Sequence, residues 1–433
     1  MMNNCCNIRF KALMAVAMCL SLFCGSVKLQ AADPTATAYG YEECRGSAMP
    51  YVVPSRAVSY PDSLTPVFIN HVGRHGARFL SSPRKLNRLV AALRKADSLK
   101  TITPLGRRLL SLTGDITRRS EGQWGALDSL GMAEQRGIAS RMYASFPELF
   151  RHKKIEAISS YVPRCIMSMD VFTHQLSRLD NKLSIYTSSG RQNNSLLRFF
   201  EDNTEYREAV RSTPVKDAYE AFENHAMTLE PLRRVLGAGF PYDDSAADLA
   251  MGEYSVLAGT AAMGMSGKEC DLSQYFRPEE INALWSINNL SQYLQRTATT
   301  LTPLPAEIAA PLLRELVNTT DDAVSGKSAA TVMLRFGHAE TLMPLFALMR
   351  LPGCWYLTNY FDTVALNWHN FYVVPMASNL QMILFRSDSG RHYVRFDLNE
   401  VPVKLRHNVS EYLDWNEARQ ILIEECLPLW EQP

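Results

Sequence analysis

Short apolar runs and longer segments of helical spacing alternate over much of the chain. The apolar runs are rich in Val, Ile and Phe, as is typical of buried strands, and occupy 67–72, 155–160 and 329–336. Segments that predict helices lie at 85–99, 125–142, 340–351 and 410–424, and a hairpin is predicted at 373–385 and 392–398. This alternation predicts an α/β fold. Residues 101–122 form a polar, arginine-rich segment.

The pattern changes between residues 186 and 319, where helical segments follow one another with few strand signals. The longest predicted helices lie at 194–209, 216–236 and 278–297, joined by loops rich in Gly, Ser and Met. An all-helical insertion between two α/β segments predicts a cap. We therefore expect an α/β core formed by residues 33–185 and 320–433, and an α-helical cap formed by residues 186–319.

The first 32 residues have the organisation of a secretory signal peptide. Two basic residues precede the apolar run 12–24, which is too short to span a membrane, and small residues follow it. We therefore expect export to the periplasm or the medium, with no membrane span. Lipidation of Cys24 is a competing interpretation, which the bulky Phe23 just before it disfavours.

Composition and charge exclude several classes of partner. Hydrophobic residues make up 46% of the 433 residues and charged residues 21%, as in ordinary globular proteins. The formal net charge is +1, so nothing favours nucleic acid or an anionic membrane, and any electropositive site must be local. The cysteines outside residues 1–32 lack metal-site spacing and allow at most two disulfides, whose pairing the sequence leaves open: Cys44, Cys165, Cys270, Cys354 and Cys426.

The string Arg74-His-Gly-Ala-Arg78 follows the first predicted strand and holds several residues that could bind an anion or react with it. We expect the strand to stop at Gly73 and to open a helix, which would bring Arg74, His75 and Arg78 together with the helix's first N–H groups. Two guanidiniums at such a point suit a carboxylate or a phosphate. A neutral imidazole between them is also a nucleophile near neutral pH.

The strand predicted at 329–336 also stops at a glycine and presents His338 and Glu340. Glu340, taken alone, is also compatible with a carboxylate that faces the N-terminus of a helix. His338 and the glycine that ends the strand favour a site instead. Arg164 follows the strand predicted at 155–160, and by itself it is equally compatible with a surface arginine.

Together these motifs resemble the histidine phosphatase superfamily, clade 2. Arg74-His-Gly-x-Arg78 is the signature of that superfamily, although Leu80 stands where a proline is usual. Arg164, followed by Ser168 and Phe172, is similar to the strand-end arginine that supplies the third phosphate-binding guanidinium.

Two further stretches resemble the same superfamily. The helix predicted at 125–142, with Asp128 or Ser129 as its N-cap, is similar to a helix with glycine and glutamate or glutamine. His338-Ala-Glu340, in place of the commoner His-Asp, resembles the multiple inositol-polyphosphate phosphatase (phytase) branch. Residues 196–202 also resemble a stretch of that branch, which bears on substrate.

The resemblance implies a fold and a substrate. The fold is a histidine-phosphatase-like α/β core with a central mixed sheet flanked by helices, plus an inserted all-α cap. The substrate is phytate or a related inositol phosphate, and neither a metal nor another cofactor is implied. Arginines in the site supply the positive charge that a metal would otherwise provide.

The resemblance also implies a role for each site residue. His75 would attack phosphorus and form a covalent phosphohistidine, while Glu340 would protonate the leaving group and later take a proton from water. We expect burial under the cap to raise the pKa of Glu340 enough for it to be protonated at mildly acidic pH. The phosphate would be bound by Arg74, Arg78, Arg164 and His338, and the rest of the substrate by Lys85 and Arg198.

Other functions are compatible with the same motifs. Within the hydrolases, a broad-specificity histidine acid phosphatase or a glucose-1-phosphatase is the alternative. Phosphoglycerate mutases share the Arg-His-Gly turn, but they are typically shorter and cytosolic. A secreted phosphate-binding protein without activity is disfavoured, because His75, His338 and Glu340 are all present.

Overall fold

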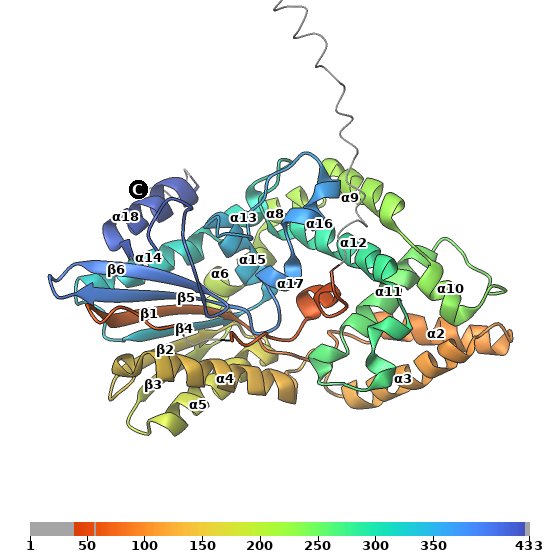
Figure 1. Cartoon of the computed structure of the whole chain (residues 1–433), viewed down its shortest axis with the longest axis horizontal. Helices are drawn as coiled ribbons and strands as arrows, with labels where there is room; N and C mark the ends of the chain where they lie inside the picture. The colour runs from red at the N-terminus through yellow and green to blue at the C-terminus, as the bar shows by residue number, and fades with distance from the viewer. Residues whose placement is uncertain (1–38, 56–57, 429–433) are drawn as a thin grey trace, which may run out of the picture.

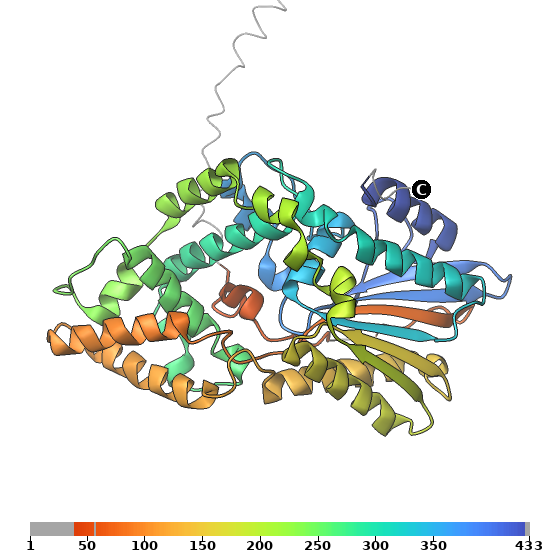
Figure 2. The same cartoon turned by 180° about the vertical axis from the view of Figure 1, so that it is seen from behind.

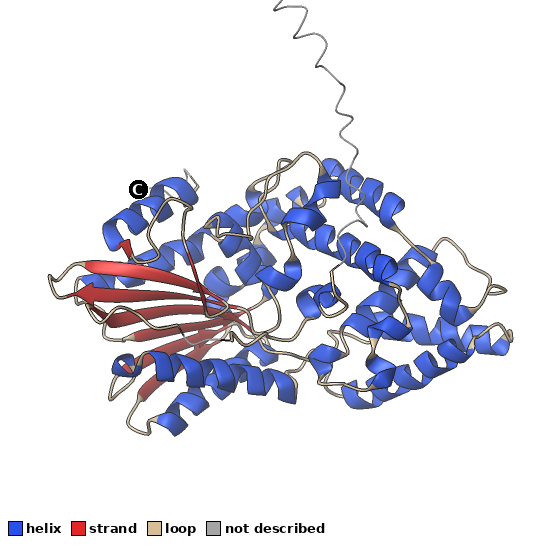
Figure 3. Cartoon of the chain, in the orientation of Figure 1, coloured by secondary structure: helices blue, strands red, loops and turns tan. Residues whose placement is uncertain are grey.

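A mixed β-sheet forms the centre of one lobe of the molecule (Figures 1 and 3). In the computed structural model, which describes residues 39–55 and 58–428, the sheet has eight strands in the order β3-β2-β4-β1-β5-β6-β7, with β8 paired to β6. The strands are β1 (Leu64–Arg74), β2 (Lys154–Ser159), β3 (Ser184–Ser189), β4 (Val332–Gly337), β5 (Asn379–Ser387), β6 (His392–Leu398), β7 (Val401–Val403) and β8 (Leu413–Asp414). Strands β3, β2, β4 and β1 are parallel, and β5 joins β1 in the antiparallel direction. The expected α/β fold with a mixed central sheet is confirmed.

Helices cover both faces of this sheet, because successive strand residues point to opposite sides. Ile69 and Ile383 pack in one buried cluster with α4 (Ser129–Ser145) and α5 (Pro163–Leu179). Phe68 and Leu384, their neighbours in sequence, pack in another with α14 (Ala310–Val324), α15 (Ala339–Leu348) and α18 (Trp415–Gln420). In Figure 1 the first helix pair lies below the sheet, and α14 and α18 lie above it.

The second lobe is helical (Figure 1, and from behind in Figure 2). Between β3 and β4 in sequence the chain forms α6 (Asn194–Leu197), α7 (Phe199–Asp202), α8 (Thr204–Ala209), α9 (Thr213–Ala226), α10 (Glu230–Leu236), α11 (Ala246–Ala258), α12 (Pro278–Arg296) and α13 (Leu304–Glu307). Most of these helices belong to the second lobe, whereas α6 packs against α14 and β4 of the first. Two helices from before β2, α2 (Arg84–Ser98) and α3 (Pro104–Ser120), pack with α10 and α11 around a shared buried cluster. Two short helices after α15 complete the set, α16 (Val364–Asn367) and α17 (Asn370–Val373).

Several elements were missing from the sequence prediction, and two of them, α3 and β3, show why. The polar segment 101–122 contains α3, which Thr103 caps by accepting a hydrogen bond from the Gly106 N–H, with Pro104 as its first residue. Its buried leucines recur at helical spacing among the arginines, which is a pattern that the overall polarity obscured. Strand β3 is an exposed edge strand, so it lacks the apolar run that marks a buried one. It spans Ser184–Ser189 and therefore crosses the boundary that we predicted between the core segment 33–185 and the cap 186–319.

Several boundaries also differ from the prediction. The helix predicted at 194–209 is three short helices, and the one predicted at 216–236 is α9 followed by α10. The helix after β1 begins only at Arg84, so the Arg-His-Gly turn does not open it directly, contrary to expectation. The hairpin β5–β6 and the helix α12 are confirmed, although β5 begins at Asn379 and not at residue 373. The helix predicted at 410–424 begins at Trp415, and α18 continues into a π-helix at Ile421–Cys426.

The five cysteines outside residues 1–38 are all buried and free, so no disulfide forms among the described residues. The predicted signal peptide at 1–32 lies outside the described residues. No helix in the described part of the chain has the length and hydropathy needed to cross a bilayer.

Candidate active site

The carboxyl ends of β1 and β4 bring the two histidine motifs together. The two strands are parallel neighbours, and their register pairs Arg74 with Gly337. The His75 N–H donates to the Gly337 carbonyl at 3.1 Å, and the rings of His75 and His338 lie 5.8 Å apart between centroids. Strand β2 lies on the other side of β4, and the helix that follows it, α5, carries Arg164. The parallel strands therefore collect the candidate residues at one edge of the sheet.

His75 is buried, and its charge state and tautomer are those that a nucleophile needs. Its Nδ1 lies 2.9 Å from the Gly76 carbonyl oxygen, which can only accept, so Nδ1 carries the hydrogen and Nε2 keeps the lone pair. Burial, and then the charges of Arg74 and Arg164, hold the pKa of His75 well below its usual range. The imidazole is therefore neutral, with Nε2 free to attack an electrophile.

Helix α4 holds the loop that carries His75. The Glu134 carboxylate accepts hydrogen bonds from the N–H groups of Ala77 and Tyr51, and Gln135 donates to the Arg74 carbonyl at 3.0 Å. Asp128, one of the two residues predicted as the cap, is the N-cap of α4. A Cβ atom on Gly131 would collide with the Ala77 backbone, so the helix can approach the loop this closely only with glycine at that position.

Arg74, which is buried, and Arg78 and Arg164, which are half-buried, form a cationic cluster with unused hydrogen-bond donors. The Nε atom of each is buried and has no hydrogen-bond partner within the described residues. Burial and mutual repulsion lower the pKa of Arg74 to about 9 and that of Arg78 to about 10. Unpaired buried donors and repelling charges both favour a bound anion, and guanidiniums match phosphate geometry.

His338 lies beside this cluster and is also neutral. Burial and the charge of Arg164 lower its pKa to about 3. Its Nε2 lies 2.9 Å from both Ser160 Oγ and Arg198 Nη1. Both ring nitrogens face a guanidinium, which can only donate, and a neutral imidazole has one accepting nitrogen. The shorter contact is at Nε2, so Nε2 accepts and the ring hydrogen sits on Nδ1, which lies 3.3 Å from Arg164 Nη2. Two donors this close suit an anion that accepts from both of them.

Arg198, expected to bind substrate, contacts His338 in this structure. Its Nε donates to Glu201 at 2.7 Å, and its guanidinium lies over the rings of Tyr161 and Phe200. These contacts fix its orientation toward His338. Its expected contact with substrate therefore stays a prediction.

Glu340 lies in the first turn of α15 and is paired with Arg296, the last residue of α12. The Arg296 Nη2 atom lies 3.0 Å from Glu340 Oε1. Burial raises the pKa of Glu340, but the electrostatic interactions of the carboxylate, first of all with the positive charge of Arg296, outweigh burial and lower the pKa to about 2. The expectation that burial under the cap raises this pKa is therefore wrong, because an arginine that the sequence did not point to stands opposite the carboxylate.

Lys85 lies near the cluster without contacting His75 or Glu340. It lines a cavity of about 350 Å³ with Arg78 and Arg84, and its Nζ donates to Ser255 Oγ at 2.9 Å. The cavity shares Arg78 with the cationic cluster, so it extends the basic surface beyond the site of a single phosphate. The contact of Lys85 with substrate remains a prediction.

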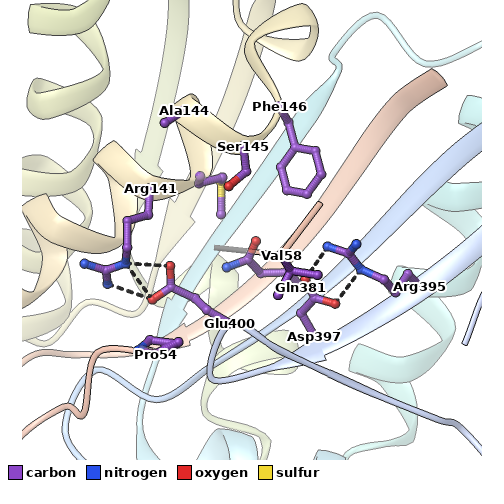
Figure 4. Close-up of a pocket in the computed structure, with 11 residues that line it drawn as sticks. Pro54, Val58, Arg141, Ala144, Ser145, Phe146, Gln381, Arg395, Asp397 and Glu400 are labelled. Carbon is purple, nitrogen blue, oxygen red and sulfur yellow. Dashed lines mark hydrogen bonds and ion pairs between the residues drawn. The ribbon is translucent and has the colours of Figure 1, made fainter. Parts of the chain in front are cut away.

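A separate cavity of about 130 Å³ lies at the other end of α4 (Figure 4). Its charged side chains already neutralise one another: Arg141 pairs with Glu400, and Arg395 with Asp397. None of the candidate site residues lines it. The pair of Arg141 and Glu400 joins α4 to the turn between β6 and β7.

Sequence reasoning missed Arg296 and the loop contacts of Glu134. Arg296 ends a helix predicted correctly, but nothing in the sequence relates it to Glu340. The sequence predicts the helix that contains Glu134, but it does not predict that the Glu134 carboxylate accepts a hydrogen bond from the Ala77 N–H. In the part of the chain that the structure describes, no group of His, Cys, Asp and Glu has the arrangement of a metal site.

The fold and the site define a class of protein. The chain matches the model of the histidine phosphatase superfamily (branch 2) over residues 67–399, and it belongs to that family. The match spans both strand-end motifs and the helices between them. The chain is accordingly an enzyme of the phosphoric monoester hydrolase class.

Two curated proteins are similar to this chain over most of their length. The chain is 25% identical over 398 residues to multiple inositol polyphosphate phosphatase 1 of Homo sapiens, covering 84% of this chain and 80% of that protein. It is 24% identical over 390 residues to the Gallus gallus protein of the same name, covering 84% of each.

Solved structures share the fold. The multiple inositol polyphosphate phosphatase of Bifidobacterium longum, in complex with inositol hexasulfate, superposes with a TM-score of 0.77 at 20% identity, covering 90% of this chain and 99% of that one. A phytase from D. castellii gives a TM-score of 0.69 at 16% identity, covering 89% and 85%.

Proposed function

We propose that this chain hydrolyses inositol polyphosphates through a phosphohistidine on His75, with Glu340 as the proton donor. One observation supports this mechanism above others. His75 is a neutral imidazole with Nε2 free, beside three arginines whose buried Nε donors have no partner among the described residues. The site therefore combines a nucleophile with hydrogen-bond donors that can bind the oxygens of the phosphoryl group.

In the first step His75 Nε2 attacks phosphorus, and the bond from phosphorus to the ester oxygen breaks. Arg74, Arg78 and Arg164 stabilise the charge on the equatorial oxygens, and the Nδ1–H of His338 donates to one of them. Glu340 in its acid form gives its proton to the leaving alkoxide. The products are the free alcohol, a phosphoryl group on His75 and a Glu340 carboxylate.

In the second step water attacks phosphorus from the side that the alcohol has left. The phosphorus–nitrogen bond breaks, and its electron pair returns to Nε2 of His75. The Glu340 carboxylate takes a proton from the attacking water, which restores its acid form. Inorganic phosphate then leaves, and His75 is free to attack the next ester.

The substrate class rests on the relatives and on the cavity beside the site. The curated relatives are named multiple inositol polyphosphate phosphatases, and one structural neighbour was solved with inositol hexasulfate. Arg84 and Lys85 line the cavity that extends from Arg78, which favours a substrate with more than one phosphate. A broad-specificity histidine acid phosphatase or a glucose-1-phosphatase is the alternative, since the phosphoryl chemistry would be the same.

Two further proposals concern organisation and location. We propose that residues 186–319 act as a cap over the site, supported by the contact of Arg296 with Glu340. We propose export because residues 1–32 have the pattern of a signal peptide. The mass of the mature protein purified from the producing cell would test the second proposal.

The experiment compares the wild type with His75→Ala on inositol hexakisphosphate and on glucose 1-phosphate. We expect the wild type to release phosphate stepwise from the inositol ring and to act far more slowly on the sugar phosphate. His75→Ala should lose turnover of both while keeping the wild-type melting temperature. Turnover by the folded variant would contradict the phosphohistidine, and a preference for the sugar phosphate would favour the alternative substrate.

A further inference from the structure

The ion pair between Arg296 and Glu340 connects the helical lobe to the proposed acid. Arg296 is the last residue of α12, and Glu340 is in the first turn of α15. Arg296 Nη2 donates a hydrogen bond to Glu340 Oε1 at 3.0 Å. Within the described residues, this is the only hydrogen bond that the Arg296 guanidinium makes. The side chains are 21% and 36% exposed, so both can reach a bound ligand.

Other charged or titratable groups face Glu340, but each also belongs to the phosphate site or is uncharged. The positive ones are Arg74 and Arg78, which repel each other and have donors to spare. The remaining groups are His338, Cys165 and Tyr206, none of which carries a formal charge at mildly acidic pH. Arg296 is thus the direct counter-ion of the carboxylate.

This pairing conflicts with the role of Glu340 as an acid. A general acid must carry a proton when the ester bond breaks. A guanidinium at hydrogen-bond distance favours the carboxylate form and disfavours the acid form. The free enzyme therefore holds Glu340 in the wrong state for the first step, unless substrate binding changes its surroundings.

We propose that Arg296 controls the protonation of Glu340, holding it as a carboxylate in the free enzyme and releasing it to bind a proton when a polyanionic substrate engages the guanidinium. The inference rests on the proposed function, since it assigns the acid step to Glu340. The proton comes from solvent as the substrate binds, and it passes to the leaving alkoxide in the first step. Arg296 is a positioning residue in this scheme, because it acts through Glu340.

Two physical effects act in the same direction when the substrate binds. A phosphate of the substrate competes with Glu340 for Arg296, and its charge replaces that of the carboxylate as the partner of the guanidinium. The remaining phosphate charges lie near Glu340 and disfavour its ionisation. A substrate with several phosphates exerts both effects more strongly than one with a single phosphate. Protonation of the acid would therefore be coupled to recognition of a polyanion.

Proton uptake on binding tests this coupling without turnover. Inositol hexasulfate is a suitable probe, because sulfate esters stay ionised at mildly acidic pH and any proton taken up goes to the protein. Titration calorimetry in buffers of different ionisation enthalpy measures the number of protons bound. The measurement belongs at about pH 4.3, the ordinary pKa of a glutamate, where Glu340 of the free wild type is ionised.

We expect the wild type to take up protons, and Glu340→Gln to take up one fewer. Arg296→Gln should lose part of that proton uptake, because its Glu340 is already partly protonated before binding. Arg296→Lys, which keeps the charge, should retain most of the uptake, and Arg211→Gln, an exposed arginine of the same lobe, should equal the wild type. Equal uptake in the wild type and in Glu340→Gln, or in the wild type and in Arg296→Gln, would overturn the proposal.

A second measurement covers the case in which Arg296→Gln no longer binds the probe. Infrared difference spectra between each protein and its Glu340→Gln counterpart show the C=O band of the protonated carboxyl. Without ligand, this band should persist to higher pH in Arg296→Gln than in the wild type, and an unchanged midpoint would overturn the proposal. Turnover of inositol hexakisphosphate is measured separately, so a failure of the proposed function is distinguishable from a failure of this inference.

Discussion

At the scale of single residues, the surroundings of each group set the charges of the site. Burial beside arginines keeps His75 and His338 neutral, which frees one nitrogen to attack and leaves one N–H to donate. The same burial lowers the pKa values of Arg74 and Arg78, so these arginines gain from a bound anion. Glu340 is the exception, since its counter-ion stabilises the form that cannot act as an acid.

The proposed role of Glu340 as a proton donor predicts an effect that depends on the leaving group. An inositol alkoxide is strongly basic and needs a proton to leave, whereas a nitrophenolate leaves without one. Glu340→Gln should therefore slow hydrolysis of inositol hexakisphosphate by roughly a hundred- to ten-thousandfold, as expected for lost general acid catalysis. Nitrophenyl phosphate should be affected far less, as measured by kcat for each substrate. An equal loss with both would instead assign Glu340 to positioning the phosphoryl group or water.

At the scale of elements, parallel strands gather the motifs and one helix fixes the nucleophile loop. The loop after β1 has no helix of its own at His75, since α2 begins only at Arg84. Helix α4 replaces it with hydrogen bonds from Glu134 and Gln135 and with the close approach at Gly131. The geometry of His75 therefore depends on a helix that is remote from it in sequence.

Gly131→Ala tests that dependence. Its Cβ atom would meet the backbone of Ala77, which cannot move without displacing the loop. We expect a loss of about 1–3 kcal/mol of stability from overpacking, together with a drop in kcat. Urea unfolding and turnover of nitrophenyl phosphate would measure the two effects.

Gly137→Ala in the same helix is the matched control. Its Cβ atom would meet the end of the flexible Arg141 side chain, which can move aside. Removing a mid-helix glycine should then stabilise the protein by about 0.5–1 kcal/mol and leave turnover unchanged. If both variants behaved alike, the contact of Gly131 with the loop would have no special role.

At the scale of the whole molecule, a nearly neutral chain concentrates positive charge at one place. The formal net charge is +1, yet Arg74, Arg78 and Arg164 lie together, and Arg84 and Lys85 line the adjoining cavity. Attraction of an anionic substrate is therefore local to the site. Such attraction is screened by salt more strongly when the ligand carries more charge.

Salt should accordingly raise KM for inositol hexakisphosphate more than for nitrophenyl phosphate. Between about 0.1 M and 1 M salt the screening length falls from about 10 Å to about 3 Å, so charges across the cavity cease to act on a distant phosphate. Lys85→Gln should reduce the salt dependence with the polyanion, whereas Lys182→Gln, at an exposed turn before β3, should leave it unchanged. Parallel changes of KM for both substrates would contradict a role for the cavity in binding further phosphates.

The sequence by itself determined the features that are local along the chain. Apolar runs that end in glycine predicted β1 and β4, and the residues directly after them supplied His75, His338 and Glu340. The spacing of apolar residues and the residues that favour turns depend only on near neighbours in sequence. The helix α12 and the hairpin β5–β6 were therefore also predictable. The mixed sheet came from resemblance to a family, since strand order is not a local property.

Only the tertiary structure decided what depends on contacts between distant segments. Helices α2 and α3 pack with the helical lobe, although they precede β2 in sequence, because their apolar faces meet those of α10 and α11. The pKa of Glu340 is lowered rather than raised, because α12 ends with Arg296 opposite it. Both outcomes come from groups that are close in space and far apart in sequence. Coulomb energy and burial depend on that spatial distance, which no pattern along the chain records.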